Sequence, residues 1–296
     1  MMKKVAISLF AILLMCSVQA QDKEYIKAVE QWHKARIEDL KQPNSWLNLE
    51  GLFWLHKGTN TFGKAKGSDC HYTNDAFPDL LGSFLYEGDS VIWTNAKGQS
   101  IIIDKKNTIA TQSYKVFDLN QKASVMDWKD FSWVVIKREE KVGIRFRNYN
   151  ARTLLDFKGI DRFPIKEEWH IKGKLVQPAQ DFLMITNVLG QTAATKNAGK
   201  FEFEKNGQTY SLDVIDEGGK NLFIVFADQS SGVTTYGAGR FIELTKPDAE
   251  GNTIIDFNNA YNPPCAFTPF ATCPLPPKQN RLALNIDAGE KNYGHH

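Results

Sequence analysis

The chain of 296 residues lacks a surplus of charge of either sign. It carries 36 lysines and arginines against 34 aspartates and glutamates, a formal net charge of +2. A chain with so little net charge has no long-range field that could attract a phosphate backbone or an anionic bilayer. The composition therefore predicts that nucleic acid is not a partner of this protein.

Long apolar runs are also missing, apart from one near the N-terminus. There, two lysines precede an apolar stretch over residues 5–15, followed by small residues up to Ala20, a pattern typical of secretory signal peptides. We predict a signal peptide over residues 1–20 and an exported protein, periplasmic or extracellular, without a transmembrane segment. A lipid anchor on Cys16 is the disfavoured alternative, because Met15 stands where lipoprotein processing requires a small residue.

Recognisable catalytic motifs are absent from the sequence. It contains no G-x-S-x-G, no H-E-x-x-H, no phosphate-binding G-x-x-x-x-G-K-[ST] loop and no C-x-x-C. Cys70 and His71 are adjacent, but neighbouring residues of an extended chain point to opposite faces, so they form no thiol–imidazole pair. The sequence therefore indicates neither a reaction nor a cofactor, and it predicts no metal site.

Cysteine is scarce. Removal of the signal peptide leaves Cys70, Cys265 and Cys273, and seven residues separate the last two. Export favours a disulfide between Cys265 and Cys273, which would contribute roughly 2–3 kcal/mol through loop entropy. A zinc site and two buried thiols are the alternatives, and the odd number leaves at least one cysteine without a disulfide partner.

What the sequence does contain is one helical pattern followed by many short strand patterns. Residues 22–42 repeat apolar side chains at helical spacing, and Pro43 ends the pattern. Short runs of β-branched and aromatic residues, separated by turn residues, fill the rest of the chain. We predict a mainly β protein, an antiparallel sandwich or a partly open barrel, with an N-terminal α-helix within residues 21–44 and a single β-rich domain over residues 45–296.

Two turn sequences predict hairpins. Asn206-Gly207 lies between two alternating runs, which is the strongest short hairpin signal. Residues 90–94 and 99–104 flank Asn-Ala-Lys-Gly and have the appearance of a second hairpin.

A long proline-rich segment over residues 256–280 interrupts the strand patterns near the C-terminus. It holds six of the eleven prolines of the chain together with several asparagines and aromatic residues. Each proline restricts one backbone torsion, and asparagine side chains bond to nearby backbone, so the segment is stiffened locally. Its aromatic residues can anchor it to a core, and we therefore expect an ordered loop with a functional or bracing role.

Several stretches of the sequence resemble the DUF1684 family, a domain of unknown function. They are "SWLNLEGLFWLHKGTNTFG", "TTYGAGRFIEL", "DFNNAYNPPCAFTPFATCPLPPKQNRL" and "IDAGEK". The resemblance spans roughly residues 45–291 and implies no catalytic role for any residue. The positions that match the family pattern include Trp46, Gly51, Gly63, Arg240, Asp256, Asn258, Asn262, Pro263, Cys265, Cys273, Pro274, Pro276, Asn280 and Glu290.

The candidate site residues come from three neighbouring segments at the C-terminal end. If the proline-rich segment folds over the end of the strand that follows Gly239, their side chains converge into a site for a small polar molecule or a glycan. Asp256 and Glu290 are the weak candidates for a carboxylate pair in hydrolysis. The predicted ligand-binding residues are Arg240, Asp256, Asn258, Asn262, Asn280 and Glu290.

The alternative hypothesis gives the same residues a purely structural role. In that case Arg240 pairs with an acidic residue, the asparagines satisfy backbone groups, and the cluster only braces the loop. The protein is then a non-catalytic structural or interaction domain.

Overall fold

The computed structural model describes residues 23–106 and 113–294, so the predicted signal peptide and Cys16 lie outside the described residues. Residue contacts divide the chain into two compact units, each described here by itself. Lys41–Lys158 and Phe267–Ala271 form one unit, the sandwich unit; the N-terminal helix, Gly159–Ala266 and the residues from Thr272 onward form the other, the half-barrel unit. Residues 45–296, predicted as a single β-rich domain, are divided between these two units, and each unit contains its own hydrophobic cluster.

The sandwich unit contains two five-stranded sheets. The strand order of the first sheet is β1 (Leu49–Trp54), β10 (Lys141–Asn148), β9 (Phe131–Arg138), β8 (Val125–Trp128) and β6 (Ile102–Ile103). The order of the second sheet is β3 (Cys70–His71), β2 (Gly58–Gly63), β4 (Gly82–Glu87), β5 (Ser90–Asn95) and β7 (Ser113–Asp118). Only the pairing of β2 with β3 is parallel among these strands.

Aromatic rings fill the space between these two sheets. Phe62, Phe84 and Trp93 from the second sheet and Trp133 and Phe146 from the first are all completely buried. Their ring centroids lie 4.7 to 6.3 Å apart in tilted and edge-to-face pairs, the geometry that aromatic quadrupoles favour. A short helix, α2 (Arg152–Leu155), follows β10.

The hairpin predicted around Asn-Ala-Lys-Gly is wrong. β5 pairs with β4 on one edge and with β7 on the other, so no edge remains for the following strand. β6 joins the other sheet instead, where it pairs with β8. Local turn residues indicated a reversal of the chain after β5. The preceding strand β4, two residues before β5, takes one edge of β5, and β7, which is farther along the chain, takes the other.

The half-barrel unit is built on one curled antiparallel sheet. Its strand order is β16 (Arg240–Leu244), β15 (Leu222–Phe226), β14 (Gln208–Ile215), β13 (Thr192–Lys205), β11 (His170–Val176) and β17 (Asn252–Asp256), and β12 (Phe182–Thr186) pairs with the first half of β13. The end strands β16 and β17 approach each other, and Thr253 Oγ1 donates a hydrogen bond to the carbonyl of Thr245 at 2.7 Å. The mainly β, partly open architecture predicted from the sequence is confirmed.

The Asn206-Gly207 hairpin is confirmed as the turn between β13 and β14. Both residues have positive φ, 53° and 73°, as a tight two-residue hairpin turn requires. β13 is long enough to pair with three strands, and a register shift between Asn197 and Gly199 marks the point where its partner changes.

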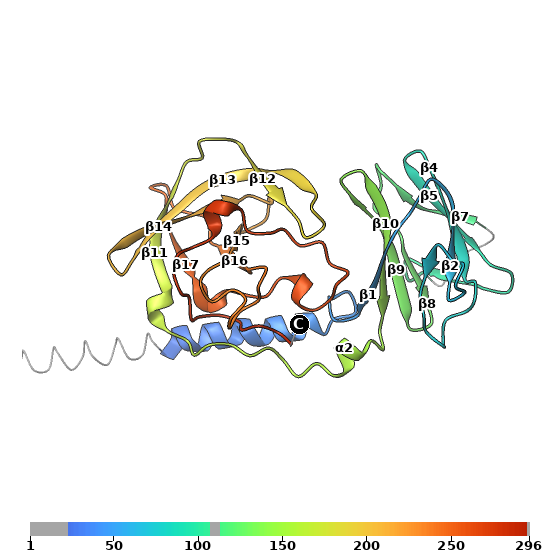
Figure 1. Ribbon diagram of the computed structural model, residues 1–296, viewed down its shortest axis with the longest axis horizontal. Helices are drawn as coiled ribbons and strands as arrows, with labels where there is room; N and C mark the ends of the chain where they lie inside the picture. Colours follow the sequence, from blue (N-terminus) through green and yellow to red (C-terminus); the bar gives the residue numbers. More distant parts are fainter. Residues whose placement is uncertain (1–22, 107–112, 295–296) are drawn as a thin grey trace, which may run out of the picture. The chain divides into compact units, whose positions relative to one another are not determined.

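The helix and the proline-rich segment both belong mainly to the half-barrel unit. The helix occupies residues 23–40 of the described chain, close to the prediction, and Figure 1 shows it in blue along the half-barrel elements. Within the described residues no helix is long and apolar enough to span a bilayer. The segment 256–280 is ordered by three short 3-10 helices, η2 (Phe257–Asn259), η3 (Pro264–Ala266) and η4 (Lys278–Asn280), and another, η1 (Glu167–Trp169), precedes β11.

Candidate functional site

The predicted site residues are almost all buried in the half-barrel unit. Arg240, Asn258, Asn262, Asn280 and Glu290 each expose 3 % of their surface or less, whereas Asp256 is half-buried. Because buried polar groups need partners, the first question is which hydrogen bonds these side chains already make within the chain.

Arg240 begins β16 and is held by a buried carboxylate and by backbone carbonyls. Its Nη2 donates to Asp228 Oδ2 at 3.2 Å and to the carbonyl of Ile286 at 3.1 Å, while Nη1 donates to the carbonyl of Ala288. Burial lowers the pKa of Arg240, and the charge of Asp228 opposes this shift. The guanidinium therefore fastens the C-terminal strand-like segment onto β16.

Asp228 is a site residue that the sequence analysis missed. Its Oδ1 accepts hydrogen bonds from the hydroxyls of Ser230 and Ser231, and its Oδ2 also accepts the backbone N–H of Ile286 at 2.8 Å. The only local signal is the Asp-x-Ser-Ser-Gly turn that follows β15, which does not reveal a partner twelve residues away.

Asn280 fills a gap between two neighbouring strands. β14 and β15 share a single paired position, Ile215 with Phe223. Farther along, Asn280 Oδ1 accepts the backbone N–H of Asp213 at 2.7 Å, and its Nδ2 donates to the carbonyls of Asp213 and Val225, each at 2.9 Å. The Asn280 amide thus replaces the ladder hydrogen bonds that the diverging strands cannot make with each other.

Glu290 and Asn262 connect the helix to the C-terminal segment. Arg36 Nε, on the helix, lies 2.6 Å from Glu290 Oε1, and the backbone N–H of Asn262 donates to Glu290 Oε2 at 2.7 Å. Asn262 Nδ2 in turn donates to the carbonyl of Lys291 at 2.7 Å. The guanidinium of Arg36 also stacks on Tyr261, 4.4 Å from the ring centroid.

Asp256 and Asn258 form a second cluster around the helix residue Tyr25. Asp256 Oδ1 accepts hydrogen bonds from the Tyr25 hydroxyl at 2.9 Å and from both the backbone and the side-chain nitrogen of Asn258 at 3.0 Å. Asp256 Oδ2 accepts one from Asn259 Nδ2 at 3.2 Å. Burial, followed by the charge of Asp256, raises the pKa of Tyr25, so the phenol stays protonated and acts as the donor.

Asp256 also faces an open pocket in the half-barrel unit, called here the Asp256 pocket. Its volume is about 360 Å³, and it lies where β11, β16 and β17 meet the helix. No lysine or arginine is among the lining residues, which are Trp32, His170, Asn221, Glu243, Thr245, Ile254, Asp256, Asn259 and Tyr261. Of the six predicted ligand-binding residues, only Asp256 lines this pocket.

The pocket combines aromatic faces with hydrogen-bonding groups. The rings of Trp32 and Tyr261 lie 6.1 Å apart, and burial raises the pKa of Tyr261 to about 12, so its phenol is neutral. His170 occupies the position on β11 directly opposite Asp256 on β17. Asn259 Oδ1 is buried and has no hydrogen-bond partner among the described residues.

Sequence reasoning missed most of these lining residues, because they come from different elements. Trp32 lies on the helix, Asn221 precedes β15, and His170 and Glu243 belong to strands that are not neighbours in the sequence. No sequence spacing connects them; only the curl of the sheet brings β16 next to β17.

No disulfide joins the two cysteines of the proline-rich segment in the structure. The backbone N–H of Cys265 donates to Cys273 Sγ at 3.1 Å, and the backbone N–H of Cys273 donates to Cys265 Sγ at 3.3 Å. The disulfide therefore stays a prediction, although the two residues are neighbours. Within the described residues, no group of three or more histidine, cysteine or acidic side chains could hold a metal ion.

The chain has detectable similarity to a solved structure and to a family model. It is similar to an uncharacterised protein of Haloarcula marismortui, known from a solution NMR structure, with 26% sequence identity and a TM-score of 0.39 over 46% of this chain and 77% of the other. No curated protein matches it significantly. The predicted resemblance to DUF1684 is confirmed for the C-terminal part, while residues 45–154 lie outside the match. Residues 155–291 match the model of the family described as "Protein of unknown function (DUF1684)".

Proposed function

We propose that the half-barrel unit binds a small hydroxyl-rich ligand, such as a monosaccharide or disaccharide, in the Asp256 pocket. The observation that carries this proposal is the composition of the pocket wall. Two aromatic rings, two carboxylates and two amides line it, together with one imidazole and no cationic lysine or arginine. Aromatic faces pack against the C–H groups of a sugar ring, and carboxylates and amides accept and donate hydrogen bonds to its hydroxyls.

The charge of the pocket supports a ligand without negative charge. Asp256 and Glu243 are both acidic, and a phosphate or carboxylate would meet them without a lysine or arginine on the pocket wall to compensate. The proposed ligand class is therefore neutral and polar.

Binding is a better-supported activity than hydrolysis. Asp256 already accepts four hydrogen bonds from Tyr25, Asn258 and Asn259. Oδ1 accepts three of these bonds and Oδ2 one, so the carboxylate is held in a fixed orientation while Oδ2 can still accept a hydrogen bond from a ligand hydroxyl. The proposal includes export of the mature chain, which the signal-peptide pattern of residues 1–20 supports.

A ligand screen with matched variants tests the proposal. We expect common mono- and disaccharides, screened by calorimetry at concentrations up to about 10 mM, to include at least one with a Kd of about 1 mM or below. Glu243→Gln and Trp32→Ala should each weaken its binding by about tenfold. Glu250→Gln, on the exposed turn before β17, is the matched control and should leave binding unchanged. Absence of binding by every sugar, or binding by both pocket variants that is as tight as binding by the unsubstituted protein, would refute the proposal.

The bracing hypothesis has its own supporting observation, and it concerns the other predicted residues. Arg240, Asn262, Asn280 and Glu290 direct their hydrogen bonds to backbone groups and to partners within the chain. We infer that these four residues hold the C-terminal segment on the sheet, while the pocket nearby carries the binding function.

A further inference from the structure

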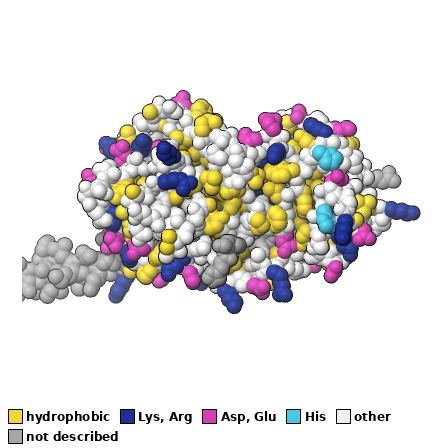
Figure 2. All heavy atoms as spheres, viewed as in Figure 1, with side chains coloured by type: hydrophobic (Ala, Val, Ile, Leu, Met, Phe, Trp, Pro, Cys, Tyr) yellow, Lys and Arg dark blue, Asp and Glu magenta, His cyan; other side chains and the backbone are white. Residues whose placement is uncertain are grey.

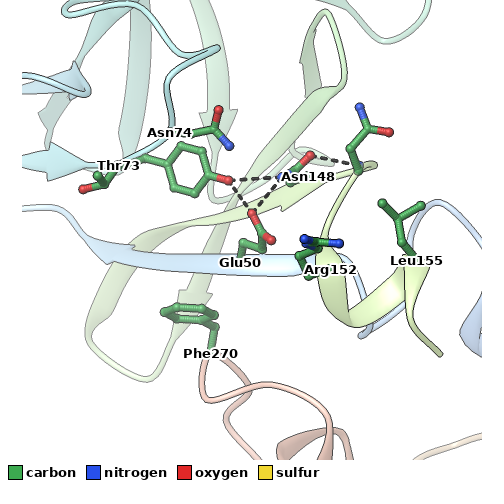
Figure 3. A pocket seen from close by; sticks show the side chains of 9 residues that line it. Glu50, Thr73, Asn74, Asn148, Arg152, Leu155 and Phe270 are labelled. Carbon is green, nitrogen blue, oxygen red and sulfur yellow. Dashed lines mark hydrogen bonds between the residues drawn. The ribbon is translucent and has the colours of Figure 1, made fainter.

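A second cavity lies in the sandwich unit, and most of its lining residues precede residues 155–291, the part of the chain that matches the family model. Its volume is about 610 Å³, large enough for a small organic molecule. Figure 3 shows it between β1, the end of β10 and the short helix α2. The cavity, called here the Glu50 cavity, is lined by Glu50, Tyr72, Thr73, Asn74, Asn148, Asn150, Arg152, Leu155 and Phe270.

Three hydrogen-bonded side chains form its most buried wall. Tyr72 and Asn148 expose 9 % and 5 % of their surface. The Tyr72 hydroxyl donates to Glu50 Oε2, and Asn148 Nδ2 donates to the same oxygen at 2.9 Å (Figure 3). Asn148 Oδ1 is occupied by the backbone N–H of Asn150 at 2.9 Å. The amide orientation is thereby set, and the carboxylate is held rigidly through one of its two oxygens.

Burial keeps the Tyr72 hydroxyl protonated. Desolvation, followed by the hydrogen bond to Glu50 and the charge of Glu50, raises the pKa of Tyr72. The phenol is therefore a neutral donor to the Glu50 carboxylate. The other oxygen, Oε1, has no hydrogen-bond partner in the described part of the chain, and it is not sealed away from solvent. The cavity thus presents a fixed negative charge that the protein has not neutralised.

A positive charge lines the same cavity. Arg152 is exposed at the start of α2, and no ion pair with Glu50 or with another acidic residue is found among the described residues. Figure 3 shows the Arg152 side chain beside Glu50, with Leu155 farther along the helix. One wall of the cavity therefore carries two separate charges of opposite sign.

An aromatic side chain, Phe270, also lines the cavity. Phe270 belongs to the short segment Phe267–Ala271, which is part of the sandwich unit. Thr268 anchors this segment because its Oγ1 donates to the carbonyl of Leu49 at 2.8 Å, next to Glu50. The Phe270 ring thus lines the same cavity as Glu50 and Arg152, and Figure 3 shows all three side chains.

From this arrangement we propose that the Glu50 cavity binds a zwitterion with an apolar side chain, namely an aromatic amino acid or a short peptide that contains one. The ammonium group of the ligand pairs with Glu50 Oε1, its carboxylate pairs with Arg152, and its side chain packs against Phe270. The amides of Asn74 and Asn150 and the hydroxyl of Thr73 line the rest of the cavity and suit a peptide bond. A neutral ligand would form no ion pair with Glu50 or Arg152, and a ligand with a single charge would form an ion pair with only one of them.

The test uses four probes that differ in their charged ends. Phenylalanine and glycyl-phenylalanine are zwitterions, phenethylamine lacks the carboxylate, and N-acetyl-phenylalanine lacks the ammonium group. Binding is measured by calorimetry or ligand-observed NMR with probes at up to about 10 mM. We expect at least one zwitterion to bind, and each truncated probe to bind with an affinity that is lower by about tenfold or more. No binding of either zwitterion, or equal binding of all four probes, overturns the proposal.

Substitutions at the two charges identify the site. Arg152→Gln removes the cation at an exposed position and should bring the affinity for the zwitterion down to that for phenethylamine. Glu50→Gln should bring it down to that for N-acetyl-phenylalanine, provided that the circular dichroism spectrum is unchanged. Arg138→Gln, exposed in the same unit but away from the cavity, is the matched control. Unchanged affinity in Arg152→Gln overturns the proposal even if Glu50→Gln fails to fold.

Discussion

Single side chains in this protein satisfy backbone groups that pairing between strands leaves without hydrogen bonds. Asn280 is the clearest case, since its amide supplies three hydrogen bonds to backbone groups of β14 and β15 where these strands diverge. Arg240 acts in the same way on the C-terminal segment, through three carbonyls and one carboxylate. The sequence analysis predicted both residues as ligand-binding residues. In the structure, their hydrogen bonds are made to other groups of the same chain.

The role of Asn280 leads to a stability prediction. Asn280→Ala leaves one buried N–H and two buried carbonyls without partners, and it should lower the free energy of unfolding by about 3 kcal/mol. Urea denaturation followed by tryptophan fluorescence measures the change. Asn292→Ala, at an exposed position, is the matched control and should shift the midpoint little. An unchanged midpoint for Asn280→Ala would contradict the bracing role.

At the scale of elements, the helix over residues 23–40 is attached to the rest of the half-barrel unit through polar contacts of Tyr25 and Arg36. Tyr25 donates to Asp256, and Arg36 pairs with Glu290, whose side chain is 1 % exposed. Its apolar face is narrow, since Val29 and Leu40 are its only fully buried apolar residues within the described part. Helical periodicity was sufficient to predict the helix, but it could not show that polar residues on the same face provide the attachment.

We expect the Arg36 contact to be essential for this attachment. Arg36→Met leaves the buried carboxylate of Glu290 without its cation, which should cost about 3 kcal/mol. Lys34→Met changes the same kind of charge at an exposed position of the same helix and should be nearly neutral. Thermal unfolding compares the two, and an equal small shift in both variants would show that the ion pair is dispensable.

The proline-rich segment carries a prediction about its thiols. Burial raises the pKa of Cys70 to about 12, whereas the hydrogen bond with the Cys273 thiol lowers the pKa of Cys265. Because the thiolate is the nucleophile, Cys265 should react with iodoacetamide near neutral pH well before Cys70. Mass spectrometry of native protein that is first reduced and then partly alkylated gives the order, and faster labelling of Cys70 would contradict this assignment.

The same experiment addresses the predicted disulfide. Oxidised protein prepared without reductant should show Cys265 and Cys273 protected together and only Cys70 free after unfolding. Alkylation of all three cysteines in that sample would exclude the bridge.

At the scale of the whole molecule, the described chain contains two hydrophobic cores, one in each unit. The aromatic cluster of the sandwich unit and the cluster around Phe226 and Phe257 in the half-barrel unit are distinct sets of buried residues. Basic and acidic side chains are interspersed on the face seen in Figure 2, in agreement with the balanced composition. The expectation of a single domain rested on the absence of a linker, and a chain can pass between units without one.

Because the two cores are separate, a substitution that creates a void in one core should mainly destabilise the unit that contains it. Phe257→Ala should remove about 3–5 kcal/mol from the half-barrel core. Amide hydrogen exchange should therefore accelerate strongly in β11 to β17 and less in β1 to β10. Trp133→Ala, in the other core, should give the reverse pattern. Uniform acceleration across all strands in both variants would show that the two clusters unfold as one.

Sequence alone was enough for the features that depend on neighbours in the chain. Helical spacing up to Pro43, alternating strands and the Asn206-Gly207 turn all act over a few residues, and each was predicted correctly. Tertiary structure alone decided which strands pair, that the sheet curls until β16 meets β17, and which polar groups line a cavity. The reason is physical: torsional preferences and side-chain periodicity are local, but the register and the partner of a buried polar atom depend on the whole packed chain. Asp256 was recognisable as a polar residue in a stiff loop, while its neighbours His170, Trp32 and Glu243 became neighbours only through folding.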